Sequence, residues 1–203
     1  MSMSDLPSCF PGFEAIHRYM DRRDDEVVAE LRPGDFYVTK RGERIITILG
    51  SCVAACVRDV KVGVGGMNHF LLPNVSRSAP GSWSDAARYG SYAMETLINE
   101  VLKRGGAKNR LEIKIFGGAR IIEGLSDVGA KNVDFVTRYL DLEQLSVESK
   151  DVGGEQARVV HYWPVTGRVR VKKIKGAAKL AATEVSYGAR ISDAVPCGDV
   201  ELF

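Results

Sequence analysis

No apolar run in this chain is long enough to cross a membrane, because a spanning helix needs roughly 20 consecutive apolar residues. The opening stretch, MSMSDLPSCFPGF, also lacks the charged and then apolar pattern of a secretory signal. We therefore expect a cytoplasmic protein with no direct membrane insertion. In that compartment the cysteines stay reduced, so disulfides are not expected.

The chain also lacks a large excess of one charge, because 28 basic residues are balanced by 26 acidic ones and leave a net charge of +2. Such a balance gives no bulk attraction to nucleic acid. The one strongly basic stretch, residues 168–175, reads RVRVKKIK and has no interleaved aromatic residues for stacking on bases. Lysines in such a strand often protect a sheet edge from pairing with another molecule. We expect no nucleic-acid partner.

Metal-binding and phosphate-binding patterns are absent as well. The four cysteines and three histidines match no zinc spacing, since Cys52 and Cys56 form a C-x₃-C pair that no second pair follows. Gly117-Gly118-Ala119 lacks the Gly-x-x-x-x-Gly-Lys spacing of a phosphate loop. We expect neither a metal nor a cofactor.

The remaining pattern is that of a layered α/β domain. Hydrophobic residues make up 45% of the 203 residues, enough for one sizeable core. Alternating or continuous apolar runs predict strands, and three- and four-residue apolar steps predict helices. The predicted strands are 36–39, 45–49, 111–116, 145–149, 158–163 and 168–174, and the predicted helices are 86–104 and 127–140. We expect an N-terminal extension packing on the core (1–33), a main domain (34–175) and a weakly ordered tail (176–203).

One stretch places a cysteine and a histidine on either side of a predicted hairpin turn. Residues 45–73 read IITILGSCVAACVRDVKVGVGGMNHFLLP, and the turn is expected at 59–62. In the corresponding register, paired residue numbers add to 121, so Cys52 faces His69 with Cβ atoms roughly 4.5–5.5 Å apart. An imidazole at that distance can convert a thiol into a nucleophilic thiolate. A bulge at Gly65 or Gly66 would shift this register.

Each residue also has a plainer explanation. Free cysteine is commonly a small buried hydrophobe, and a lone histidine is often a core residue satisfied by backbone. Gly50 and Ser51 leave steric room beside Cys52, which favours the reactive interpretation. Cys56 is a weaker candidate, because the same register puts it opposite Gly65, which has no side chain to act as a base.

A histidine base also needs a group that fixes its tautomer. The nearby candidates in the sequence are Thr47, Ser51 and Asn68. We favour Thr47, which lies on the incoming strand, although β-propensity alone would also explain a threonine there.

Four stretches of the sequence together point to a known family: TILGSCVAACVRD, GGMNHFLLP, RYGSYAMETLINEVLKRGGAKNRLEIKIFGGARII and VGAKNVDF. On these stretches the chain resembles, from about Phe10 to about Lys175, the CheD family of chemoreceptor glutamine deamidases. The resemblance implies a layered α/β sandwich with mixed, largely antiparallel sheets, similar to the catalytic domain of cytotoxic necrotizing factor. It also implies a protein-glutamine glutaminase that acts in chemotaxis on the cytoplasmic helices of methyl-accepting chemoreceptors, and the CheC phosphatase as a further partner.

The family's nucleophile corresponds to Cys52 and its general base to His69. Its third residue is a threonine that can stand six residues before the cysteine, where this chain has Ile46, so Thr47 is the nearest match. We assign Gly50, Ser51 and Asn68 to substrate or oxyanion contacts, and the loop 74–84 and the turn 117–119 to the docking rim.

Two other classes of function compete with the deamidase. The chain could be a non-catalytic adaptor that binds chemotaxis signalling proteins such as CheC through the same cleft, or a general cysteine protease or acyltransferase. The intact pair of Cys52 and His69 favours an enzyme over an adaptor, because binding alone requires no thiol beside an imidazole.

Overall fold

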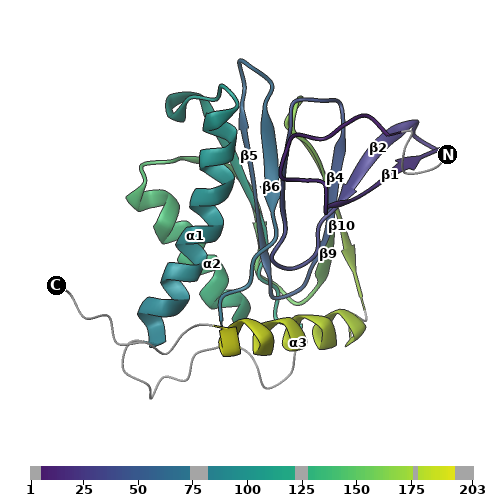
Figure 1. Cartoon of the computed structure of the whole chain (residues 1–203). Coiled ribbons are helices and arrows are strands. Elements are labelled where there is room, and N and C mark those ends of the chain that lie inside the picture. Colours follow the sequence, from purple (N-terminus) through teal and green to yellow (C-terminus); the bar gives the residue numbers. More distant parts are fainter. Residues whose placement is uncertain (1–5, 74–81, 122–127, 176–177, 195–203) are drawn as a thin grey trace.

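The computed structural model describes residues 6–73, 82–121, 128–175 and 178–194 (Figure 1). Two five-stranded sheets stack face to face, and helices cover the outer face of the second sheet (Figure 1). The first sheet has the order β1 (His17–Asp21), β2 (Glu26–Glu30), β4 (Arg44–Leu49), β9 (Ala157–Trp163) and β10 (Arg168–Ile174). The second has the order β3 (Phe36–Thr39), β6 (Gly65–Asn68), β5 (Val53–Asp59), β7 (Leu111–Gly117) and β8 (Val147–Val152).

Both sheets are mixed but largely antiparallel. Among the described strand pairs, β2 with β4 and β7 with β8 are parallel, and the other named pairs are antiparallel. The layered α/β sandwich expected from the sequence is confirmed. The basic strand β10 lies at the edge of its sheet, where cationic residues oppose unwanted strand pairing.

Helices α1 (Ser82–Lys103) and α2 (Val128–Leu142) pack against the second sheet (Figure 1). Each buries an apolar stripe at helical spacing, as the sequence predicts. The stripe of α1 contains Met94, Leu97, Ile98 and Val101, and that of α2 contains Phe135, Val136 and Leu140. Helix α1 begins four residues before the expected start. A short 3₁₀ turn, η2 (Lys108–Arg110), links α1 to β7.

Both ends of the chain contribute more regular secondary structure to the fold than the sequence indicates. Strands β1 and β2 belong to the first sheet, so residues 17–30 form part of the sandwich. The expected weakly ordered tail contains helix α3 (Ala178–Ala194), which lies across one end of both sheets (Figure 1). Its inner side includes Leu180, Tyr187 and Ile191, whose spacing suits a helix although the segment is otherwise rich in small and polar residues. Within the described residues, no helix is long and apolar enough to cross a membrane.

The β5–β6 hairpin forms, but in a different register from the predicted one. Cys56 pairs with Met67, and Val53 forms a bridge with Phe70, so paired numbers add to 123. The connection is centred one residue later than expected, because it spans residues 60–64 and uses Gly63 at φ 68°. The prediction that Cys52 lies directly opposite His69 is therefore wrong.

This register error has little effect on which face the side chains occupy. Side chains alternate between faces with a period of two, so a two-residue shift keeps each one on its predicted face. Cys52 and His69 consequently remain on the same side of the hairpin as diagonal rather than direct neighbours. The same shift places Cys56 opposite Met67 and not opposite Gly65.

Candidate active site

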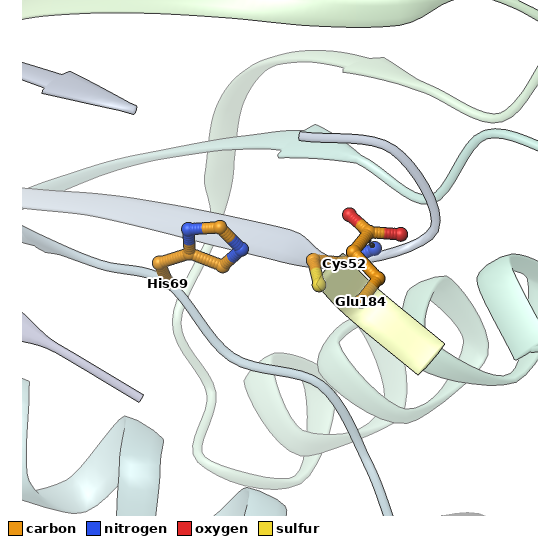
Figure 2. A group of neighbouring side chains, drawn as sticks. All are labelled: Cys52, His69 and Glu184. Atoms are coloured by element: carbon orange, nitrogen blue, oxygen red, sulfur yellow. Dashed lines mark hydrogen bonds between the residues drawn. The ribbon is translucent and has the colours of Figure 1, made fainter. Parts of the chain in front are cut away.

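Cys52 and His69 meet in a buried cluster at one end of the sandwich. Cys52 directly precedes β5 and His69 directly follows β6, and their exposed fractions are 0% and 2%. The Cys52 sulfur, a ring nitrogen of His69 and a carboxylate oxygen of Glu184 lie within 4.8 Å of one another. Figure 2 shows the imidazole turned toward Cys52 and toward Glu184, which comes from α3. The cluster therefore joins the hairpin to the C-terminal helix.

Thr47 fixes the tautomer of His69. Its hydroxyl lies 2.8 Å from the carbonyl oxygen of Leu31 and 2.7 Å from Nδ1 of His69. A hydroxyl carries a single hydrogen. Since the Leu31 carbonyl can only accept, Thr47 donates to it and accepts from the Nδ1–H of His69. The other ring nitrogen, Nε2, then carries the lone pair that a general base needs, and it has no hydrogen-bond partner among the described residues.

The loop of residues 50–52 is held by the glycine turn that follows β7. The backbone N–H of Gly118 donates to the Cys52 carbonyl at 2.7 Å, and that of Ala119 donates to the Gly50 carbonyl at 2.7 Å. Gly117 adopts φ 108°, and a Cβ there would lie 2.2 Å from the Cys52 carbonyl oxygen, so only glycine fits. The carbonyls of this loop are thus engaged, and its N–H groups face Glu184.

Glu184 accepts hydrogen bonds from that loop with both carboxylate oxygens. The N–H groups of Gly50 and Ser51 each lie 2.8 Å from it, that of Cys52 lies at 3.4 Å, and the Ser51 hydroxyl donates at 2.6 Å. Several converging N–H donors beside a nucleophile can bind a carboxylate or the oxyanion of an acyl-transfer intermediate. Gly50 and Ser51, which are expected to make substrate or oxyanion contacts, here hold a carboxylate.

Burial keeps both the thiol and the imidazole uncharged in this arrangement, and the nearby carboxylate adds to this effect for the thiol alone. Burial raises the pKa of the Cys52 thiol, and the negative charge of Glu184 raises it further. Burial also lowers the pKa of His69, against a smaller opposing effect of Glu184. This arrangement is therefore a resting state, in which a neutral imidazole lies close enough to a neutral thiol to accept its proton.

Asn68 has a different environment from the one expected for a substrate contact. Its side-chain oxygen accepts from the N–H of Ala55 at 2.8 Å, and its amide group donates to the carbonyl of Ala93 at 3.1 Å. The side chain thus connects β5 with α1. These contacts give Asn68 a role in holding the hairpin that carries His69.

Asn132 supports the site from α2 and was not among the predicted residues. It is fully buried, accepts from the N–H of Leu72 at 2.9 Å and donates to the carbonyl of Ser51 at 2.8 Å. It therefore ties the segment after His69 to the segment before Cys52. The available signal was a polar residue within the apolar stripe of a predicted helix.

Glu184 is not among the predicted site residues, because the composition of residues 176–203 indicates a weakly ordered tail. Leu180, Glu184, Tyr187 and Ile191 follow each other at three- and four-residue steps, so the acid lies on the apolar side of a helix. A single carboxylate in such a stripe indicates a buried partner for its charge.

Cys56, His17 and His161 lie outside this cluster. Cys56 is buried within β5, His17 pairs with Glu30 at the surface, and His161 stacks on Trp163. Cysteine, histidine and glutamate are zinc ligands, so the cluster at Cys52 could in principle hold a metal ion. Both oxygens of Glu184 already accept N–H bonds, however, and the arrangement is explained without a metal. The absence of a metal remains an expectation.

Comparisons with known proteins agree with the resemblance seen in the sequence. The family model described as CheD chemotactic sensory transduction matches residues 71–173. A protein of Halorhodospira halophila named "Probable chemoreceptor glutamine deamidase CheD" is 45% identical over 98% of this chain and 94% of its own length. Proteins with the same name from Hahella chejuensis and Saccharophagus degradans are 44% and 42% identical, over 97% and 98% of this chain and 95% and 94% of theirs. Since both the family model and these nearly full-length relatives agree, the chain belongs to the CheD family.

Proposed function

We propose that the protein is a protein-glutamine deamidase that converts glutamine side chains of chemoreceptors to glutamate. The observation that carries the proposal is the alignment of Thr47, His69 and Cys52, with the Nδ1 of His69 bonded to Thr47 at 2.7 Å and the opposite edge of the ring facing the thiol. The relatives' name, chemoreceptor glutamine deamidase, supplies the substrate.

The chemistry has two steps. In the first, Nε2 of His69 takes the proton of Cys52, and the thiolate attacks the side-chain carbonyl carbon of a glutamine. The carbon–nitrogen bond breaks, the departing ammonia takes the proton from His69, and a thioester remains on Cys52. In the second, His69 takes a proton from water, whose oxygen attacks the thioester carbon, and the thiol leaves with that proton. Glutamine and water thus become glutamate and ammonia.

The loop of residues 50–52 would stabilise both tetrahedral intermediates. Its N–H groups lie beside the thiol and now bind the two oxygens of a carboxylate, those of Gly50 and Cys52 one oxygen and that of Ser51 the other. One such donor typically lowers the barrier by about 2.7–4 kcal/mol. These donors are backbone groups, so the loop's conformation rather than a side chain determines this contribution.

A purely adaptor role has less support. An adaptor needs a surface, but it has no use for an imidazole whose tautomer is fixed and whose free nitrogen faces a thiol. We propose that the enzyme acts in the cytoplasm on the cytoplasmic helices of chemoreceptors. The family resemblance adds the CheC phosphatase as a binding partner, which size-exclusion chromatography of the two purified proteins would test.

The direct test is incubation of the full chain with a chemoreceptor cytoplasmic fragment, followed by mass spectrometry of its peptides. Amide-to-acid conversion adds about one dalton per glutamine, and it should disappear with Cys52→Ala. Conversion that persists with Cys52→Ala would overturn the proposal.

A further inference from the structure

Helix α3 places a carboxylate where the proposed reaction would leave one. The side-chain carboxyl carbon of the product glutamate must lie beside the Cys52 sulfur. One of its oxygens must accept hydrogen bonds from the N–H donors that stabilised the oxyanion. Glu184 has this arrangement, with N–H contacts from Gly50 and Ser51 at 2.8 Å and an oxygen within 4.8 Å of the sulfur. Figure 2 shows its side chain extending from α3 to Cys52.

The helix is docked by more than this one side chain. The hydroxyl of Tyr187 shares a hydrogen bond of 2.7 Å with that of Tyr89 on α1. The Tyr187 ring lies against Gly34, where a Cβ would come within 2.3 Å of the phenol oxygen. Gly34 in turn donates its N–H to the carbonyl of His69 at 2.8 Å. Helix α3 therefore rests on the segments that carry both reactive residues.

With α3 docked, the nucleophile and its base are buried among the described residues. Cys52 is 0% exposed and His69 is 2% exposed, whereas a receptor glutamine must bring its amide carbon into contact with the sulfur. The N–H donors that the amide oxygen would use are also engaged by Glu184. A substrate can react only after this carboxylate has moved away.

Glu184 is poorly suited to a catalytic role of its own. The orienting position at Nδ1 of His69 is already filled by Thr47. A negative charge beside the thiol also opposes formation of the thiolate, which is the opposite of what a nucleophile needs. Its contacts match those of a bound product more closely than those of a catalytic acid or base.

We propose that α3 is an intramolecular product mimic, in which Glu184 occupies the subsite for the glutamine side chain. The surface that α3 covers is then the surface on which a substrate helix docks. This inference rests on the proposed deamidase function. It makes the resting enzyme self-inhibited, with the substrate helix and α3 competing for one surface. If the open form is a minor state of about 10% or less, freeing the site raises the rate by about tenfold or more.

The full-length variant Glu184→Gln tests the subsite directly. An amide held there should be attacked by Cys52, so the residue at 184 should gain about one dalton as the amide becomes an acid. The gain should be independent of protein concentration and absent from the Cys52→Ala/Glu184→Gln double variant. Glu148→Gln is the matched control, because Glu148 is exposed on β8 and an amide there should persist.

A second experiment covers the case in which an amide at position 184 releases the helix. Glu184→Ala/Tyr187→Ala removes both anchors in the full chain and should convert a receptor fragment about tenfold faster than the wild type. Ser186→Ala, on the exposed side of α3, should match the wild type.

Conversion at position 184 or acceleration by the double variant supports the inference. A persistent amide at 184, together with a wild-type rate in Glu184→Ala/Tyr187→Ala, overturns it while leaving the deamidase function intact. If neither the receptor fragment nor position 184 is converted by any variant, the proposed function itself fails, and the inference fails with it.

Discussion

The hydroxyl of Thr47 lies between the carbonyl of Leu31, 2.8 Å away, and Nδ1 of His69, 2.7 Å away. This relationship connects the two sheets, because Thr47 belongs to β4 of the first sheet and His69 follows β6 of the second. The orientation of the base therefore depends on the packing of the sandwich as well as on the hairpin.

Thr47→Val should lower kcat by about 10- to 100-fold, less than the loss of about 10²- to 10⁴-fold expected for His69→Ala. Valine keeps the shape of threonine but leaves the Nδ1–H without an acceptor, so the tautomer is no longer fixed. The measurement is the deamidation rate of a receptor fragment. Thr47→Ser retains a hydroxyl and should recover most of the activity. A wild-type rate for Thr47→Val would show that another group orients His69.

Cys52 and Cys56 should behave differently when each is replaced by alanine. Cys52→Ala should abolish deamidation while leaving the thermal midpoint close to that of the wild type. Cys56→Ala should keep substantial activity and lose about 1 kcal/mol of stability, because Cys56 is a buried packing residue 1% exposed. Activity and thermal unfolding measured on both variants test this contrast. A folded but inactive Cys56→Ala would contradict it.

Asn132→Leu should destabilise the protein by about 2–4 kcal/mol and also reduce activity. The change leaves the N–H of Leu72 and the carbonyl of Ser51 buried without partners, and each such group costs about 1–3 kcal/mol. Urea unfolding gives the free energy directly. Thr137→Ala on the same helix is a suitable comparison, since its hydroxyl donates to the Val133 carbonyl of its own helix, and it should change stability by less than about 1 kcal/mol. Equal stabilities for the two variants would refute the role assigned to Asn132.

Asp59 should make the stability of the hairpin turn depend on pH. Burial by itself would raise the pKa of its carboxyl, yet Arg110 at 2.7 Å and the N–H groups of Val62, Ala107 and Lys61 hold that pKa well below its usual range. A lowered pKa in the folded state stabilises the protein above the unfolded-state pKa of about 3.9. That contribution is lost as the pH falls below this value.

The variant Asp59→Ala should therefore cost about 1–3 kcal/mol near neutral pH and clearly less near pH 3. Urea unfolding of both proteins at the two pH values measures the difference. A cost that stays constant or grows in acid would contradict the assignment.

The proximity of Cys52 and His69 could be predicted from the sequence because the two residues are close along the chain. Cys52 and His69 flank one hairpin, and an error of two residues in the register left both on the same face. The contact of Thr47 with His69 also agrees with the sequence, since Thr47 lies on the strand that leads to Cys52.

The long-range parts of the site could not be derived in this way. Glu184 reaches the loop of residues 50–52 from more than 130 positions away, and its position depends on α3 packing across the end of the sandwich. Asn132 similarly acts from α2. Local periodicity can show that such a polar residue lies on a buried face, but not which backbone groups it meets there.

The central claim is that Cys52 cuts a glutamine amide through a thioester that water then hydrolyses. It is tested most directly by running the reaction on a receptor fragment in water enriched in heavy oxygen and sequencing the peptides by mass spectrometry. Each converted glutamine should carry one heavy oxygen, a gain of about three daltons, and Cys52→Ala and His69→Ala should give none. Heavy-oxygen glutamate formed equally well by Cys52→Ala would contradict it.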